Sequence, residues 1–253
     1  MRSIGILDSG LGGLTVYKAV KTLLPNEKII YFGDTKNAPY GGREIEELRG
    51  FAVDMVNFLL SKNVKLILIA CNTLSATSYS FLKEKFPDVN FIELIETGAI
   101  SSIKQGKNIG VMATLGTVNS GAFEKKIKNL CSDAKVISVA CPKLVPLIES
   151  GDWETNEMAI ALDEYLAPLK NVDSLILGCT HYPIIAPRIG HTNIIDPAYG
   201  AAELAKDFLT KKGLLENSNS PDEFFVSKSP AMFNALAQKF LACEIDAKER
   251  SLQ

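Results

Sequence analysis

Two stretches of the chain end an apolar run on a cysteine, and they decide the fold: Leu66-Ile67-Leu68-Ile69-Ala70-Cys71-Asn72-Thr73 and Leu175-Ile176-Leu177-Gly178-Cys179-Thr180. Continuous Ile and Leu runs of this length are typical of strands that are buried on both faces of a parallel sheet. Because each run leads into a cysteine and then a polar residue, the chain is predicted to contain the same strand and the same strand end twice.

The rest of the chain extends this likeness into an internal duplication. Apolar segments of the first part have partners in the second part at a nearly constant spacing, which four independent accidents would not produce. The paired segments are residues 3–8 with 108–113, 29–34 with 136–141, 36–40 with 143–147, and 66–73 with 175–180.

Apolar residues at spacings of three and four predict helices between these strands. The predicted helices cover residues 14–23, 45–60, 75–85, 120–130, 154–166 and 201–211. The alternation of strand and helix predicts an α/β fold of two pseudo-symmetric lobes, each a mainly parallel sheet flanked by helices, with the active site in the cleft between them.

The duplication also predicts how the chain divides between the lobes. We assign residues 1–97 with 207–253 to the first lobe and residues 98–206 to the second. Residues 224–241 resume a strand and then a helix, and we expect them to return to the first lobe because the second repeat is already complete. Residues 213–222, rich in Asn, Ser and Pro, are predicted as a loop.

Composition excludes several classes of function. Of the 253 residues 47% are hydrophobic, enough for a substantial core, and 27 basic and 29 acidic residues are interspersed, which gives no footprint for nucleic acid. The five cysteines show no CxxC spacing and are accompanied by two histidines, so neither disulfides nor a metal site are expected. No apolar run suggests a signal peptide or a membrane span, so we expect a soluble cytoplasmic protein.

Ligands of parallel α/β sheets bind beyond the carboxyl ends of the strands, which directs attention to Cys71 and Cys179. The two thiols hold equivalent positions in the two repeats, so facing lobes would bring them to opposite sides of one ligand. Inverting a stereocentre needs a base on one face and an acid on the other, and a tuned thiol serves as either. A lone cysteine at a strand end is more often an inert buried thiol, but the matched pair favours catalysis.

Each thiol needs an ionisable neighbour that relays its proton or holds its orientation. Asp8 is the candidate for Cys71, and His181 is the candidate for Cys179, with Glu149 acting on the imidazole. The alternatives are that Asp8 is a helix N-cap, His181 an ordinary loop histidine and Glu149 a surface residue.

The remaining side chains at the predicted strand ends are neutral and suit carboxylates and an ammonium group. Many such residues would also occur there as caps and turns. The glycines of Gly10-Leu11-Gly12-Gly13 do not form a dinucleotide fingerprint, and no phosphate-binding GxxxxGK[ST] loop is present. The candidate ligand-binding residues are Ser9, Tyr40, Asn72, Thr73, Thr114, Thr117 and Thr180, with backbone N–H groups at Gly10, Gly12, Gly13 and Gly41.

Six motifs together carry a family resemblance: Asp8-Ser9-Gly10-Leu11-Gly12-Gly13, Tyr31-Phe32-Gly33-Asp34-Thr35 with Pro39-Tyr40-Gly41, Ala70-Cys71-Asn72-Thr73, Thr117-Val118-Asn119-Ser120, Cys141-Pro142 through Val145-Pro146-Leu147-Ile148-Glu149, and Gly178-Cys179-Thr180-His181-Tyr182-Pro183. Over essentially its whole length the chain resembles the bacterial glutamate racemases of the aspartate/glutamate racemase superfamily. It departs from the family's usual residues at Leu74, Thr97, Phe123 and Leu144, none of which is a proposed acid or base.

The resemblance implies interconversion of L- and D-glutamate without pyridoxal phosphate, metal or nucleotide, by a homodimer that supplies D-glutamate for peptidoglycan and so for the cell wall and cell shape. It implies that the Cys71 side removes the α-proton of the D-enantiomer and the Cys179 side that of the L-enantiomer. It also implies that substrate is bound by Asp8-Ser9, Tyr40-Gly41, Asn72-Thr73 and Thr180-His181, with Thr114 and Thr117 as additional contacts.

Three other functions stay open at this point. An aspartate racemase or a related isomerase would use the same two thiols, and pocket length would separate it from a glutamate racemase. A non-catalytic pair of binding lobes could clamp a dicarboxylate, although it would not need paired thiols. A cysteine hydrolase could use Cys179 and His181, although their closeness in the sequence makes that geometry doubtful.

Overall fold

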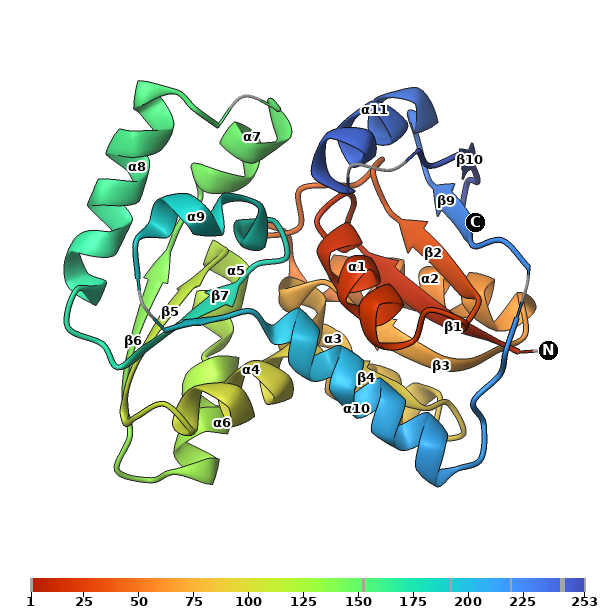
Figure 1. Ribbon diagram of the computed structural model, residues 1–253, viewed down its shortest axis with the longest axis horizontal. Helices are drawn as coiled ribbons and strands as arrows, with labels where there is room; N and C mark the ends of the chain where they lie inside the picture. The colour runs from red at the N-terminus through yellow and green to blue at the C-terminus, as the bar shows by residue number, and fades with distance from the viewer. Residues whose placement is uncertain (1, 152, 192, 219, 242–243, 253) are drawn as a thin grey trace.

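The computed structural model describes residues 2–151, 153–191, 193–218, 220–241 and 244–252. These residues form two lobes that lie side by side, each with its own sheet (Figure 1). The first sheet has the strand order β10-β9-β2-β1-β3-β4, and every neighbouring pair is parallel. Its strands are β1 (Ser3–Asp8), β2 (Ile29–Gly33), β3 (Val64–Ile69), β4 (Phe91–Glu93), β9 (Glu223–Val226) and β10 (Ala247–Glu249).

The second sheet is also entirely parallel and has the order β6-β5-β7-β8. Its strands are β5 (Asn108–Ala113), β6 (Lys135–Ala140), β7 (Ser174–Gly178) and β8 (Ile194–Ile195). Two parallel sheets flanked by helices confirm the predicted fold class. The strands β1 and β7 are buried along their whole length, as their continuous apolar sequences require.

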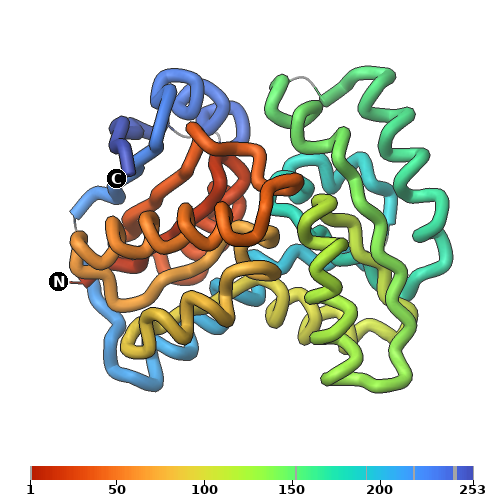
Figure 2. The backbone as a smooth tube through the Cα atoms, turned by 180° about the vertical axis from the view of Figure 1, so that it is seen from behind, coloured from red at the N-terminus to blue at the C-terminus, as the bar shows by residue number. Residues whose placement is uncertain are grey.

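Helices cover both faces of each sheet. In the first lobe α1, α10 and α11 pack on one face, while α2 and α3 pack on the other, the face seen from behind in Figure 2. In the second lobe α7 and α8 cover one face, and α4 and α6 cover the other. The helices are α1 (Leu14–Leu23), α2 (Ile45–Ser61), α3 (Asn72–Lys85), α4 (Leu94–Ile103), α5 (Leu115–Ser120), α6 (Ala122–Leu130), α7 (Leu144–Glu149), α8 (Asn156–Leu166), α9 (Ala186–Ile189), α10 (Pro197–Lys211) and α11 (Pro230–Leu241), with 3-10 turns at Ala167–Leu169 and Tyr182–Ile185.

All six predicted helices are present, and two of them differ in a way that concerns the site. The helix predicted to begin at Ser75 begins at Asn72, directly after Cys71, so that its first turn lies at the strand end. The segment predicted as one helix over residues 120–130 is divided, because Gly121 adopts a left-handed φ of 63° between α5 and α6. As a result Thr114 caps a short separate helix that faces the cleft.

The C-terminal segment returns to the first sheet as predicted, because β9 pairs in parallel with β2 from Ile30↔Glu223 to Gly33↔Val226. Among the described residues of 213–222 there is no helix or strand. The exact division of the chain between lobes stays a prediction. Helix α10 runs unbroken past the predicted boundary at residues 206/207 and packs on both α1 and α4, in the region where α4 and α10 lie side by side below the sheets (Figure 1).

Candidate active site

The carboxyl ends of β1, β3, β5 and β7 converge on one narrow cavity between the lobes. The first lobe contributes the residues that follow β1 and β3, and the second lobe contributes those that follow β5 and β7. Eleven of the sixteen predicted site residues line this cavity, whereas Asp8, Thr117 and the three glycines Gly10, Gly12 and Gly13 do not. The eleven are Ser9, Tyr40, Gly41, Cys71, Asn72, Thr73, Thr114, Glu149, Cys179, Thr180 and His181.

Cys71 lies between the end of β3 and the first turn of α3. Its side chain is buried, and its Sγ lies 3.7 Å from the Oγ of Ser9. Burial, together with the nearby carboxylate of Asp8, raises the pKa of the Cys71 thiol to about 12. Without a ligand this thiol is therefore protonated at neutral pH and can act as an acid.

Asp8 is the last residue of β1 and is fully buried. Its Oδ2 accepts a hydrogen bond of 2.8 Å from the backbone N–H of Gly10, while its Oδ1 has no hydrogen-bond partner among the described residues. Burial raises the pKa of Asp8, and the nearby His181 opposes part of that rise. A buried carboxylate oxygen without a partner is costly, so Asp8 fits a group that exchanges protons more than it fits a helix cap.

Cys179, His181 and Glu149 form a chain from a buried thiol to a partly exposed carboxylate. The Sγ of Cys179 lies 3.7 Å from the Nδ1 of His181, and the Nε2 of His181 lies 2.9 Å from the Oε1 of Glu149. Burial alone would lower the pKa of His181, but its hydrogen bonds to Cys179 and Glu149 raise it to about 10. Glu149, the last residue of α7, keeps 38% of its side chain exposed, so it links the buried imidazole to solvent.

Three threonine hydroxyls form a cluster that joins the two lobes. The Oγ1 of Thr114 lies 2.9 Å from that of Thr73 and 3.0 Å from that of Thr117. Thr114 and Thr117 belong to the start of α5 in the second lobe, whereas Thr73 lies in the first turn of α3 in the first lobe. Thr117 does not line the cavity itself, but its hydroxyl contacts that of Thr114, which does.

Asn72 shows that the cavity is built for a polar ligand. Its side chain is 2% exposed, and neither its Nδ2 nor its Oδ1 has a hydrogen-bond partner in the part of the chain that the structure describes. Buried amides are almost always hydrogen-bonded. Because Asn72 lines the cavity, a ligand that brings both an acceptor and a donor would satisfy it.

Tyr40 differs from the expectation that it is a free hydroxyl donor. Its hydroxyl donates a hydrogen bond of 2.6 Å to the Oδ2 of the buried Asp34. That proton is already in use, so the Tyr40 hydroxyl is not free to donate to a ligand, although Tyr40 and Gly41 both line the cavity.

The comparisons with known proteins agree with this geometry. Residues 4–205 match the sequence profile of the family described as Asp/Glu/Hydantoin racemase. The chain belongs to that family. The match spans both sheets from β1 to β8, and it ends before β9 and the C-terminal helix.

Individual members of the family are similar over nearly their full length. A glutamate racemase of Lactococcus lactis subsp. cremoris (strain MG1363) is 42% identical over 95% of this chain and 92% of its own. A glutamate racemase structure from Bacillus anthracis has a TM-score of 0.95 at 36% identity, covering 99% of this chain and 98% of that one. A third, from Francisella tularensis subsp. tularensis SCHU S4 in complex with D-glutamate, has a TM-score of 0.93 at 36% identity, covering 100% and 98%. These findings confirm the predicted resemblance and the predicted class, an isomerase acting on amino acids.

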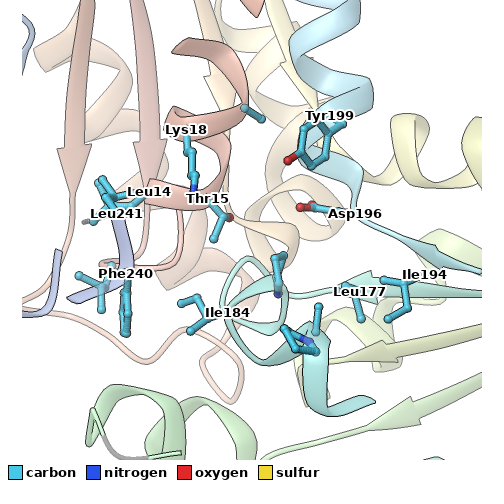
Figure 3. A pocket seen from close by; sticks show the side chains of 15 residues that line it. Leu14, Thr15, Lys18, Leu177, Ile184, Ile194, Asp196, Tyr199, Phe240 and Leu241 are labelled. Atoms are coloured by element: carbon cyan, nitrogen blue, oxygen red, sulfur yellow. The ribbon is translucent and has the colours of Figure 1, made fainter. Parts of the chain in front are cut away.

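A larger cavity of about 370 Å³ lies elsewhere between the lobes of this racemase (Figure 3). It is bordered by α1, α9, α10 and the end of α11, and its lining is mostly apolar, with Lys18, Asp196 and Tyr199 as its charged or phenolic side chains. No cysteine is among the described residues that line it. Cavity volume alone would therefore not have identified the cavity that Cys71 and Cys179 line.

Two further observations concern metal binding and membrane spanning. Among the described residues no three or more His, Cys, Asp or Glu side chains are grouped so that they could hold a metal ion. In the same residues, every helix is too short or too polar to cross a bilayer.

Sequence reasoning assigned no role to three residues that line the cavity, Ala38, Pro39 and Val145, although Pro39 and Val145 stand in the motifs that carry the resemblance. The duplication contains the signal for one of them, because residues 36–40 pair with 143–147 and Ala38 then corresponds to Val145. Apolar side chains carry no chemistry of their own, so only the position of these residues could have drawn attention to them.

Proposed function

We propose that the chain is a cofactor-independent glutamate racemase that interconverts L- and D-glutamate by two-base transfer of the α-proton. The observation that carries the proposal is that Cys71 and Cys179 line one cavity from equivalent strand ends of the two lobes. A base on one face of the α-carbon and an acid on the other are what inversion requires. The names of the most similar relatives support glutamate as the substrate.

In the proposed reaction the thiolate of Cys71 takes the α-proton of D-glutamate, and the thiol of Cys179 gives a proton to the opposite face of the carbanion. From L-glutamate the two cysteines exchange roles. Because the pKa of the Cys71 thiol is about 12 in the free enzyme, this half-reaction needs a charge that favours the thiolate. The ammonium group of the substrate supplies that charge when it binds beside the thiol.

The two sides are served by different neighbours. Asp8 and Ser9 lie on the Cys71 side, where Asp8 exchanges the proton of the thiol and Ser9 orients the sulfur. His181 and Glu149 lie on the Cys179 side and pass its proton toward the cavity rim. This difference makes the two half-reactions chemically unequal.

The substrate's carboxylates and ammonium group are proposed to meet neutral donors and acceptors rather than a strong base. The buried amide of Asn72 takes one polar group of the substrate. The first turn of α3, a helix of 14 residues, favours an anion at its N-terminus, where Thr73 lies. Further contacts come from Ser9, Thr114 with Thr117 behind it, Thr180, His181 and the backbone of Tyr40-Gly41.

Several further properties of the proposed function rest on the sequence and on the family resemblance. We propose that the D-glutamate is used for peptidoglycan, and so for the cell wall and cell shape. We also propose that the enzyme works in the cytoplasm as a homodimer, and that its lobes comprise residues 1–97 with 207–253 and residues 98–206.

The deciding experiment is incubation of the protein with single amino-acid enantiomers in deuterated water. Glutamate should exchange its α-proton and racemise much faster than aspartate, and equal or faster exchange of aspartate would overturn the substrate assignment. Cys71→Ser and Cys179→Ser should each abolish racemisation. Cys131→Ser is the matched control, because Cys131 lies at the end of α6 and does not line the cavity. Full activity in both active-site variants would rule out the two-thiol mechanism.

A further inference from the structure

The carboxylate of Asp34 is the centre of a buried hydrogen-bond cluster at the end of β2. The side chain is completely buried and accepts from three side-chain donors. The hydroxyl of Tyr40 lies 2.6 Å from Oδ2, the hydroxyl of Ser227 lies 2.6 Å from Oδ1, and the Nδ2 of Asn37 lies 2.9 Å from Oδ2. Hydrogen bonds to an ionised acceptor are the stronger kind, so this cluster fixes the chain around it.

Ser227 belongs to a distant part of the chain. It follows β9 directly and is 5% exposed. Its Oγ accepts a hydrogen bond of 2.8 Å from the backbone N–H of Lys36, which leaves its own proton for Asp34. Its backbone N–H donates to the carbonyl of Gly33 at 3.1 Å. Ser227 therefore contacts the last residue of β2 once and the loop after it twice, although it lies outside the residues 4–205 that match the family profile.

The loop held in this way, residues 34–41, leads into the active site. Tyr40 and Gly41 line the cavity between the two cysteines. The carbonyl oxygen of Gly41 accepts a hydrogen bond of 2.7 Å from the backbone N–H of Gly116, in the first turn of α5 in the second lobe. One end of the loop is thus attached to the C-terminal segment, and the other end is attached to the opposite lobe.

We propose that Ser227 is a positioning residue for the racemase reaction: through Asp34 it holds Tyr40, and with it the 34–41 loop, in the conformation that completes the cavity. The proposal rests on the proposed function for its kinetic consequence, but not for its structural one. The C-terminal segment then has a part in catalysis, although none of its described residues lines the cavity. These hydrogen bonds order the loop before the substrate binds, so that the free energy of substrate binding is not reduced by the entropy lost in ordering it.

The test compares Ser227→Ala with Ser102→Ala in the full-length protein. Ser102 is a matched control because it is also buried and its hydroxyl donates one hydrogen bond, to the carbonyl of Ala99 within α4. Ser227→Ala should lower kcat/KM for both enantiomers about tenfold, mainly by raising KM, because loss of one charge-assisted hydrogen bond releases the loop. Ser102→Ala should leave kcat/KM within about twofold.

A second pair of variants tests whether the effect passes through Tyr40. In a Tyr40→Phe background the hydroxyl that Asp34 orients is absent, so Ser227→Ala should add less than about a twofold further loss. If the losses in kcat/KM caused by Ser227→Ala and Tyr40→Phe multiply in the double variant, Ser227 does not act through Tyr40 and the proposal is overturned. A Ser227→Ala variant with the kcat/KM of Ser102→Ala would overturn it as well.

Hydrogen exchange of the peptide that covers residues 34–43 gives a readout that does not depend on activity. Ser227→Ala should raise exchange in this peptide while exchange in β1 stays unchanged. Unchanged exchange at residues 34–43 would overturn the positioning role even in an active racemase. Absence of racemisation in the unaltered protein would instead overturn the proposed function and leave the exchange result to decide the positioning role.

Discussion

The Nε2 of His181 lies 2.9 Å from the Oε1 of Glu149, while the opposite ring nitrogen lies 3.7 Å from the Sγ of Cys179. An imidazolium uses both of its N–H groups in this arrangement, which is why the pKa of His181 is raised to about 10 although burial acts to lower it. The chain has two histidines, so a spectrum of ¹⁵N-labelled histidine can follow this ring directly.

The first prediction is that His181 stays protonated up to about pH 9 in the free enzyme. Glu149→Gln removes the partner's charge and should lower the pKa of His181. His191→Asn assigns the two signals, because His191 does not line the cavity. Titration of His181 near its ordinary value of 6.5, with no response to Glu149→Gln, would contradict the prediction.

The same interaction sets the sign of a pH effect on stability. The pKa of His181 is higher in the folded than in the unfolded chain, so its contribution is fully present below about pH 6.5 and is lost as the pH rises toward 10. The free energy of unfolding, measured with urea between these pH values, should therefore fall more steeply in the unaltered enzyme than in His181→Asn. Parallel curves would show that the histidine has no such linkage.

The unlike neighbours of the two thiols predict unequal half-reactions. Asp8→Asn should slow proton removal from D-glutamate more than from L-glutamate, and His181→Asn should do the reverse, each by on the order of 100-fold in the affected half-reaction. The measurement is wash-in of solvent deuterium from each enantiomer. Net conversion is unsuitable, because the enantiomers are equally stable and their two values of kcat/KM are tied together. Equal losses in both directions would count against separate roles.

The repeated strand ends were predictable from the sequence because they depend on local pattern. A parallel strand buried on both faces must be apolar throughout, and the residues after it must reach the ligand edge, so the pattern alone places Cys71 and Cys179 together. Their neighbours Asp8 and His181 follow from the same rule. Predicting these four residues required no knowledge of how distant segments pack.

Features that depend on packing between distant segments were not predictable. Helix α4 was missed because it is buried between elements of both lobes, and a helix covered on several sides has no polar face to give it a period. The bond between Tyr40 and Asp34 and the role of Ser227 require knowledge that β9 lies beside β2, which local pattern does not contain.

Close contact between the lobes gives a steric prediction at Gly12. A Cβ atom at this position would lie 2.5 Å from the Nδ1 of His181 and would also collide with the hydroxyl of Thr180. Gly12→Ala should therefore displace the Cys179 loop and lower kcat/KM on the order of 100-fold, because small displacements of reacting groups are that costly. Gly50→Ala is the control, since nothing lies within 4 Å of its Cβ position. Similar kcat/KM in both variants would show that the lobes can move apart at Gly12 without displacing the reacting groups.

The last prediction concerns a buried ion pair at the far end of β3 from Cys71. The Nζ of Lys65 lies 2.7 Å from the Oε2 of Glu27 and donates a hydrogen bond of 2.7 Å to the carbonyl of Leu214, and both charged side chains are almost completely buried. Lys65→Met would leave the Glu27 carboxylate buried without its cation. We expect a loss of about 3–5 kcal/mol in the free energy of unfolding, measured with urea, while kcat/KM per folded molecule is kept.

Two variants give this prediction its controls. Lys107→Met breaks an ion pair with Asp133 in which both side chains are more than 60% exposed, and such pairs contribute little to stability. The double variant Lys65→Met with Glu27→Leu removes both buried charges and should recover much of the lost stability, because the main cost lies in the unpaired carboxylate rather than in the missing attraction. A double variant no more stable than Lys65→Met alone would instead assign the loss to the contacts that fix the segment after α10 to the first lobe, which are the Leu214 carbonyl with Lys65 and the Glu216 N–H with Glu27.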